Sequence, residues 1–193
     1  MITMLKLEDL EKELAISSLR MVLNEHILGG EPICFSKDKK LVYILKRKIA
    51  DYFGIHLKMI EIVGSAKLGI SLSDTRWGKK FDNKSDIDLA IVSPELFDKA
   101  WDDLRELDSN YYSLKDQDIV FLKECFRDIP DGYISPDKLP KKSEFRKKWW
   151  QIFIDLSSKE EFEYRKIRGR LFRSWFFVEK YYSIQLRKIK GAK

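Results

Sequence analysis

Two aspartates within a short apolar segment constrain this chain more than any other feature. Residues 85–92 read Ser-Asp-Ile-Asp-Leu-Ala-Ile-Val, so that Asp86 and Asp88 alternate with apolar side chains. Successive side chains of a strand point to opposite faces, which places both carboxylates on one face. Two neighbouring carboxylates raise each other's pKa unless a cation neutralises them, and Mg²⁺ takes oxygen ligands of this kind. The pattern predicts a divalent-metal site; the alternative is a polar strand end with two solvated aspartates.

A glycine-serine turn precedes this strand. Residues 57–63 are predicted to form a buried strand that runs directly into Gly64 and Ser65. Glycine permits positive φ and close backbone approach, so such a turn can present amide groups to a phosphate. Lys67, just past the turn, is a second candidate for phosphate contact, and its alternative role is to solvate the first helical turn. Residues 74–84 form a polar insert that we expect to be an exposed loop beside the site.

This order of a strand, a glycine-serine turn opening a helix, and a second strand with two aspartates resembles the DNA polymerase β-type nucleotidyltransferase superfamily. The matching residues are Gly64, Ser65, Ser85, Asp86 and Asp88. The resemblance implies an α/β (α+β) fold, with a small mixed sheet flanked by N-terminal and C-terminal helices. It also implies that the turn and Ser85 bind a nucleoside triphosphate such as ATP. The two aspartates would hold Mg²⁺ or Mn²⁺ for in-line attack on the α-phosphate.

Members of this superfamily also use a third carboxylate on a later strand. Residues 162–173 are predicted to form such a strand, and Glu163 is the acid that lies on it. Asp155, near the end of a predicted helix, is a further candidate. The strand is strongly basic, and Arg168 and Arg170 suit bidentate contact with phosphate. An exposed edge strand kept soluble by its charge is the alternative explanation.

The composition is that of a globular protein with a moderate basic excess. A chain of 193 residues with 44% hydrophobic content can bury one substantial core. The net charge of +6 is compatible with a polyanionic ligand, a nucleotide or nucleic acid, and equally with plain solvated charge. Cys34 and Cys125 lack metal-ligand spacing, so neither a disulfide scaffold nor a zinc site is indicated. Without an apolar stretch of about 18 residues or a signal-peptide pattern, we expect a cytoplasmic protein that binds no membrane.

We predict a single domain with three parts. These are N-terminal helices over residues 1–54, a core with the site motif over 55–173, and a C-terminal helix over 174–193. Helices are expected at residues 5–28, 95–107 and 144–157, and an ordered proline-rich loop at 108–142.

The resemblance implies a metal-dependent transfer of a nucleotide to an acceptor that the sequence does not identify. Relatives modify RNA ends, proteins, small molecules or a second nucleotide. Compact prokaryotic members resemble toxin-antitoxin and antiphage components, so we expect a role of that kind. Two alternatives remain open. One is a catalytically impaired nucleotide-binding or nucleic-acid-binding module of the same fold, and the other is a subunit whose basic strand binds a partner protein.

Overall fold

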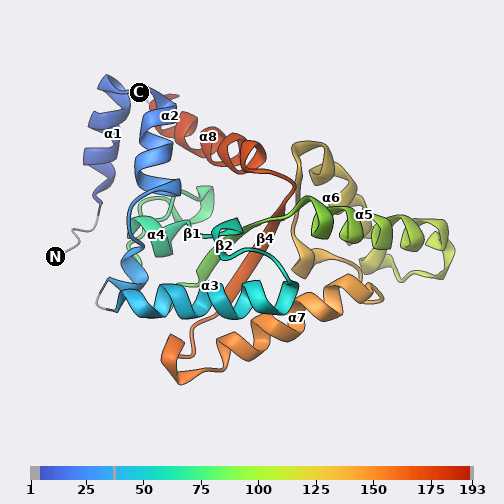
Figure 1. The fold of residues 1–193 in the computed structure, drawn as a ribbon. Coiled ribbons are helices and arrows are strands. Elements are labelled where there is room, and N and C mark those ends of the chain that lie inside the picture. The colour runs from blue at the N-terminus through green and yellow to red at the C-terminus, as the bar shows by residue number, and fades with distance from the viewer. Residues whose placement is uncertain (1–4, 37, 192–193) are drawn as a thin grey trace.

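A four-stranded mixed sheet lies between two groups of helices (Figure 1). The computed structural model describes residues 5–36 and 38–191. The strands are β1 (Ile60–Val63), β2 (Ile87–Val92), β3 (Tyr133–Ile134) and β4 (Ile167–Phe172), in the spatial order β1-β2-β4-β3. The prediction of a mixed α+β fold with a small sheet is therefore confirmed.

Helices account for most of the remaining structure. Their bounds are α1 (Leu7–Ile16), α2 (Leu19–Val22), α3 (Lys39–Phe53), α4 (Ser65–Leu68), α5 (Pro94–Ser109), α6 (Asp116–Asp128), α7 (Glu144–Ser157) and α8 (Trp175–Gly191). The π-helix η1 (Leu23–Leu28) follows α2 directly, and short 3-10 turns lie between several other elements. Within the described ranges, no helix combines the length and the hydropathy that crossing a bilayer requires.

The register of the central strands decides which side chains share a face. β2 runs antiparallel to β1, with Val63 opposite Asp88, and parallel to β4, with Asp88 opposite Arg168. Directly opposed residues project to the same side of a pleated sheet. Asp88 and Arg168 therefore lie on one face, and Ala90 and Arg170 continue the same two rows.

Each face of the sheet has its own hydrophobic core. One core includes Ile62, Leu89 and Leu171 and packs against α3, α5 and α7; in Figure 1, α3 and α7 lie below the sheet and α5 lies to its right. The other includes Ala90 and Phe172 and packs against α1, η1 and α8. This second core covers only part of its face, because the first residues of β2 and β4 carry charged side chains there.

The helix predicted at residues 5–28 is interrupted. α1 ends at Ile16, and the Ser18 hydroxyl accepts a hydrogen bond from the Met21 amide at 3.2 Å, which caps α2. Serine side chains compete with the helical backbone for hydrogen bonds and favour helix starts over helix interiors. The paired serines at 17 and 18 therefore divide an apolar pattern that is helical on both sides.

The prediction of a loop over residues 108–142 is wrong. This segment contains α6 and the short strand β3, which pairs antiparallel with β4. Leu122 and Cys125 are buried on one side of α6, while Val120 is 54% exposed. The short apolar run at 119–122 is thus one turn of an amphipathic helix. The spacing of apolar residues in so short a run does not distinguish a helix from a strand.

The late strand is shorter than predicted. β4 begins at Ile167, because Glu163 and Tyr164 adopt positive φ values of 56° and 54°. Left-handed backbone conformation cannot continue an extended strand. The segment before Lys166 is consequently a 3-10 turn and a reversal of the chain, and it removes Glu163 from the sheet.

Candidate functional site

A cleft of about 400 Å³ lies on the partly covered face of the sheet. Its walls come from the end of β1, α4, the segment at 71–80, residues 85–89 at and just before the start of β2, the middle of β4, the turn after β3, and α8. Predicted site residues that line it are Gly64, Ser65, Ser85, Asp86, Asp88, Arg168 and Arg170. The glycine-serine turn and the two aspartates therefore face one common space.

Gly64 brings the turn close to the carboxylates. Its φ of 65° and ψ of −147° are accessible to glycine and strained for other residues. A Cβ atom built on it would lie 3.4 Å from Oδ2 of Asp88. The absence of a side chain thus lets β1 turn into α4 directly beside the second aspartate.

The surroundings of Asp88 disfavour its charged form. Burial raises the pKa of this carboxyl group above its usual range, and the neighbouring charge of Asp86 raises it further. Arg168 and Arg170 act in the opposite direction without cancelling the shift, and Asp137 adds to it. A carboxylate in this position gains from an additional cation, because the arginines do not fully offset the cost of its charge.

The two arginines of β4 differ in their surroundings. Nη2 of Arg168 lies 3.3 Å from Oδ2 of Asp86, and its side chain is 43% exposed. The guanidinium of Arg170 is stacked between rings, 4.4 Å from the centroid of Tyr181 and 5.2 Å from that of Tyr133. Nε of Arg170 is buried and has no hydrogen-bond partner among the described residues. Arg168 is therefore free to exchange partners when a ligand binds, whereas Arg170 is held in the wall.

Lys67 does not reach the cleft. Its side chain is 2% exposed, and Nζ lies 2.8 Å from Oε1 of Glu61 and 2.9 Å from the carbonyl of Gly30. Lys46 contacts the other carboxylate oxygen of Glu61 at 2.6 Å. The structure gives Lys67 a buried ion pair in place of the phosphate contact that we expected from its position after the turn.

Glu163 also lies outside the cleft. Its carboxylate, 69% exposed, pairs with Nε of Arg165 at 2.8 Å, and the chain reversal at positions 163 and 164 turns it away from β4. Asp155 pairs with Lys159 one turn further along, at 2.8 Å. Neither of the acids that we considered for the third carboxylate lines the cleft with Asp86 and Asp88.

Asp137 is a cleft residue that was not among those predicted from the sequence. This residue belongs to η7 (Pro136–Lys138), which follows β3 after one residue, and it lines the cleft with Asp86 and Asp88. The signal for it was an acid following the short apolar pair Tyr133-Ile134 inside a proline-rich segment. Because we expected that segment to be a loop, its acid had no predicted place in the sheet.

The segment at 71–80, which overlaps the insert predicted at 74–84, supplies half of the basic residues of the cleft wall. Arg76, Lys79 and Lys80 line the cavity, together with the hydroxyls of Ser71 and Ser73. Backbone hydrogen bonds hold the insert in place, including Phe81 N–H to the Gly69 carbonyl at 2.8 Å. Most described residues of the loop predicted at 74–84 are exposed, and Thr75, Arg76, Lys79 and Lys80 form part of the cleft wall.

Metal-ligand spacing is met elsewhere among the described residues. Glu13, Glu25 and His26 place one ligand atom each within 4.8 Å of one another. This group lies near α1 and η1, where Nε2 of His26 and Oε2 of Glu13 form a direct contact of 2.7 Å. Asp86, Asp88 and Asp137 do not form such a tight group. Mg²⁺ commonly uses one or two carboxylates and completes its shell with substrate phosphates, which the Asp86–Asp88 pair fits.

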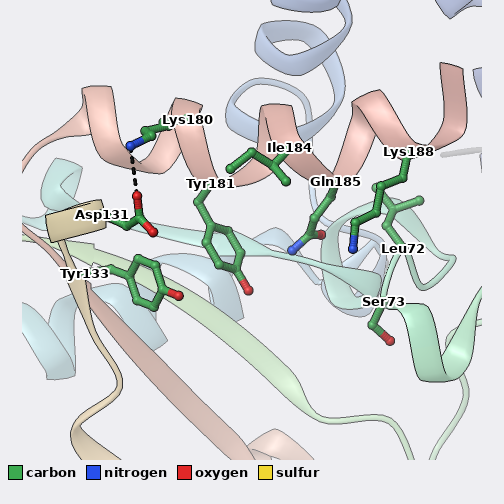
Figure 2. A pocket seen from close by; sticks show the side chains of 9 residues that line it. All are labelled: Leu72, Ser73, Asp131, Tyr133, Lys180, Tyr181, Ile184, Gln185 and Lys188. Atoms are coloured by element: carbon green, nitrogen blue, oxygen red, sulfur yellow. Dashed lines mark hydrogen bonds and ion pairs between the residues drawn. The ribbon is translucent and has the colours of Figure 1, made fainter. Parts of the chain in front are cut away.

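A second cavity of about 320 Å³ adjoins the cleft beneath α8. Figure 2 shows Tyr181, Gln185 and Lys188 extending from α8 toward Tyr133 on one side and Ser73 on the other. Leu72, Ser73, Tyr181 and Gln185 line both cavities, so the two are continuous. At its far end Lys180 contacts Asp131 at 2.9 Å.

Comparison of the chain with protein-family models, with curated proteins and with solved structures found no match in any of the three.

Proposed function

We propose that the protein is a metal-dependent nucleotidyltransferase with a fold of the DNA polymerase β type, which transfers a nucleotide from a nucleoside triphosphate to an acceptor. One observation carries this proposal. The Gly64-Ser65 turn and the pair Asp86 and Asp88 line a single cleft, with Gly64 in contact distance of Asp88. Either feature alone is common; their convergence supports the chemistry that the sequence resemblance implies.

The electrostatics of the cleft favour a divalent cation at the aspartates. Asp86 and Asp88 would hold it, and the chemistry that it would supply is positive charge to offset the negative charge that develops during transfer. The raised pKa of Asp88, caused first by burial and then by the charge of Asp86, supports this, because Arg168 and Arg170 do not cancel the shift. Asp137, in the same cleft, is our candidate for the third carboxylate.

Protein groups around the aspartates account for the rest of the nucleotide. Backbone amides of the turn at Gly64 and Ser65 are available to phosphate oxygens, and Arg76, Lys79 and Arg168 add positive charge. The cavity beneath α8 suits the base, because Tyr181 offers a ring and Gln185 offers both a donor and an acceptor (Figure 2). The residues of the chain thus position the triphosphate and exclude part of the bulk water around it.

A nucleotide-binding module without turnover is the second candidate. Arg168 already places a guanidinium 3.3 Å from Asp86, so part of the charge that a metal would supply is present in the protein itself. The carboxylate oxygens of Asp86, Asp88 and Asp137 do not all lie within 4.8 Å of one another, which favours this alternative as well. Such a module would bind a nucleotide in the same cleft and leave the α-phosphate intact.

Radiolabelled transfer separates the two candidates. The purified chain is incubated with each α-labelled nucleoside triphosphate and Mg²⁺ or Mn²⁺, alone and with total RNA or protein extract. We expect a labelled product with the wild type and none with Asp86→Asn or Asp88→Asn. Asp51→Asn, an exposed acid on α3 paired with Arg47, is the matched control and should retain transfer.

Thermal unfolding completes the test. A nucleotide-dependent rise in the unfolding temperature without any labelled product would support the binding module. Neither a product nor a shift, with any of the four nucleotides, would contradict both readings of the cleft.

A further inference from the structure

A third cavity, of about 380 Å³, lies between α7 and the first half of β4. Its walls are largely aromatic and aliphatic, with Trp149, Trp150, Phe153 and Ile154 contributed by α7. Three residues, Asp137, Arg168 and Gly169, line both this cavity and the cleft. The two spaces therefore meet at β4, and the proposed transferase site does not use the aromatic one.

The edge of β4 makes this meeting possible. β3 pairs only with Leu171 and Phe172 of β4, so residues 167–170 have no partner strand on that side among the described residues. Gly169 lies within this stretch, and a Cβ built on it would approach Phe153 to 2.6 Å and Trp149 to 2.7 Å. The glycine lets the aromatic rings of α7 lie directly against the strand, and the open edge leaves a passage between the two faces.

The apolar side chains of the cavity are buried at its base and exposed at its rim. Trp149 and Phe153 are 2% and 6% exposed, whereas Trp150 and Ile154, one turn apart on α7, are 40% and 55% exposed. The guanidinium of Arg146 lies 5.6 Å above the Trp150 ring and donates a hydrogen bond to the Leu139 carbonyl at 2.6 Å. The Arg146 guanidinium, itself fixed by this hydrogen bond, thus packs on one face of the indole, while part of the ring stays accessible to solvent.

The charges at the rim are mostly positive. Lys166 and Arg168 line the mouth and both are exposed, and Arg146 stands over Trp150. Asp137 is the one acid in the wall. A stacking surface surrounded by cations is complementary to a planar base that carries a phosphate, and single-stranded nucleic acids bind by this combination.

We infer that this cavity is the acceptor site of the proposed transferase, and that it holds the base of a nucleotide unit whose ribose hydroxyl reaches the cleft past Asp137. This inference rests on the proposed function. The position is appropriate, because the spatial order β1-β2-β4 places the Gly64-Ser65 turn and the aromatic cavity on opposite sides of the two aspartates. In-line transfer requires the attacking oxygen to approach the α-phosphorus from the side opposite the leaving oxygen.

The reaction balances without a further reactant. The acceptor hydroxyl oxygen forms a bond to the α-phosphorus, and the bond between that phosphorus and the bridging α–β oxygen breaks. Pyrophosphate leaves with the bond electrons, and the hydroxyl proton passes to the Asp137 carboxylate. The nucleotide unit in the cavity has two sources, a free mononucleotide or the end of an RNA strand.

Binding without metal tests the cavity apart from catalysis. In EDTA, which prevents a metal–nucleotide complex at the aspartates, affinity is measured for a fluorescein-labelled oligoadenylate of five nucleotides and, by calorimetry, for AMP. We expect Trp150→Ala to weaken binding about tenfold, the usual effect of losing one base-stacking ring. Tyr112→Ala, a fully exposed aromatic between α5 and α6, is the matched control and should bind as the wild type does.

A second variant, at an exposed residue, tests the cavity even if Trp150→Ala fails to fold. Lys166→Gln should weaken oligonucleotide binding by a few fold and lower its dependence on salt by about one unit of slope. Lys123→Gln, exposed on α6, should change neither. If AMP binds with the same dependence on Trp150, the acceptor is a free nucleotide; if only the oligonucleotide does, it is an RNA end.

Several results would overturn the inference. Equal binding by Trp150→Ala and Tyr112→Ala, binding of neither nucleotide ligand by the wild type, or binding of a tyrosine-containing peptide alone would each do so. These outcomes are separable from failure of the proposed function. Trp150-dependent binding in a protein that never transfers a label would leave the cavity as a nucleotide site, whereas transfer unaffected by Trp150→Ala would remove only the acceptor assignment.

Discussion

Two clusters of charge in this chain, one around Lys67 and one in the cleft, differ in their surroundings, and the contrast between them separates structural from functional charge. In the first, here called the Lys67 cluster, Lys67 and Lys46 each contact one oxygen of Glu61, and Lys67 also contacts the Gly30 carbonyl. In the cleft, Asp88 has a raised pKa and the buried Nε of Arg170 has no partner among the described residues. Charges that the protein satisfies internally stabilise the fold; charges that it leaves unbalanced are available to a ligand.

The largest expected effect on stability is in the Lys67 cluster. Lys67→Ala should lower the free energy of unfolding by about 3 kcal/mol, because it leaves Glu61 partly buried with one of its two cations removed. Urea denaturation measures the change. Lys12→Ala, which removes an exposed contact with Asp9, should change stability by less than about 1 kcal/mol. A small effect of Lys67→Ala together with a large loss of nucleotide binding would reverse our assignment of this lysine.

Substitutions of Asp137 and of Glu163 test which of the two acids acts as the third carboxylate. Asp137→Asn should lower the rate of nucleotide transfer about 100-fold, as expected for loss of a group that accepts a proton in the reaction. Glu163→Gln should leave the rate unchanged, because its carboxylate is 69% exposed and faces Arg165. Single-turnover transfer assays give both rates. The opposite pattern would return the role to Glu163 and require the turn at 163–164 to rearrange.

The smallest effect concerns Asp88 in the metal-free protein. Since its pKa is higher in the folded than in the unfolded chain, ionisation of this group favours unfolding. Asp88→Asn should therefore raise the unfolding temperature by a few degrees at neutral pH. The difference should shrink as the pH falls through the folded-state pKa and vanish below about pH 4, the ordinary value for an aspartate.

Magnesium sharpens this last comparison. Saturating Mg²⁺ should stabilise the wild type against heat and have little effect on Asp88→Asn, because the cation offsets the cost of a buried charged carboxylate next to Asp86, which the substitution already removes. Calorimetric scans at several pH values, with and without Mg²⁺, give the complete set. A wild type that is more stable than Asp88→Asn at neutral pH in EDTA would show that Arg168 and Arg170 overcompensate the carboxylate.

Local patterns located most of the cleft. The alternation at Ser85–Val92 predicted that Asp86 and Asp88 share a face; β2 begins only at Ile87, so Asp86 precedes the strand by one residue, but both aspartates line the cleft. The glycine at the end of β1 predicted a close turn, and Gly64 has positive φ beside Asp88. These inferences held because each depends on a few adjacent residues, whose backbone geometry fixes the direction of their side chains.

The failures share one cause, which is dependence on residues far apart in the chain. Lys67 was expected to point to a phosphate, but Glu61 and Gly30 give its ammonium partners inside the protein. Asp137 joined the cleft only because β3 adds to the edge of β4, and the short pair Tyr133-Ile134 is too brief to be recognised as a strand from its sequence.

By itself, the sequence determined the alternating aspartates, the glycine turn and the amphipathic helices, since hydrophobic period and backbone freedom are properties of neighbouring residues. Tertiary structure alone decided that Arg168 would lie opposite Asp88, that Asp137 would complete the acidic wall, and that the aromatic cavity of α7 would open onto the cleft. The physical reason is strand register. It is set by packing across the whole sheet, and it determines which distant side chains meet.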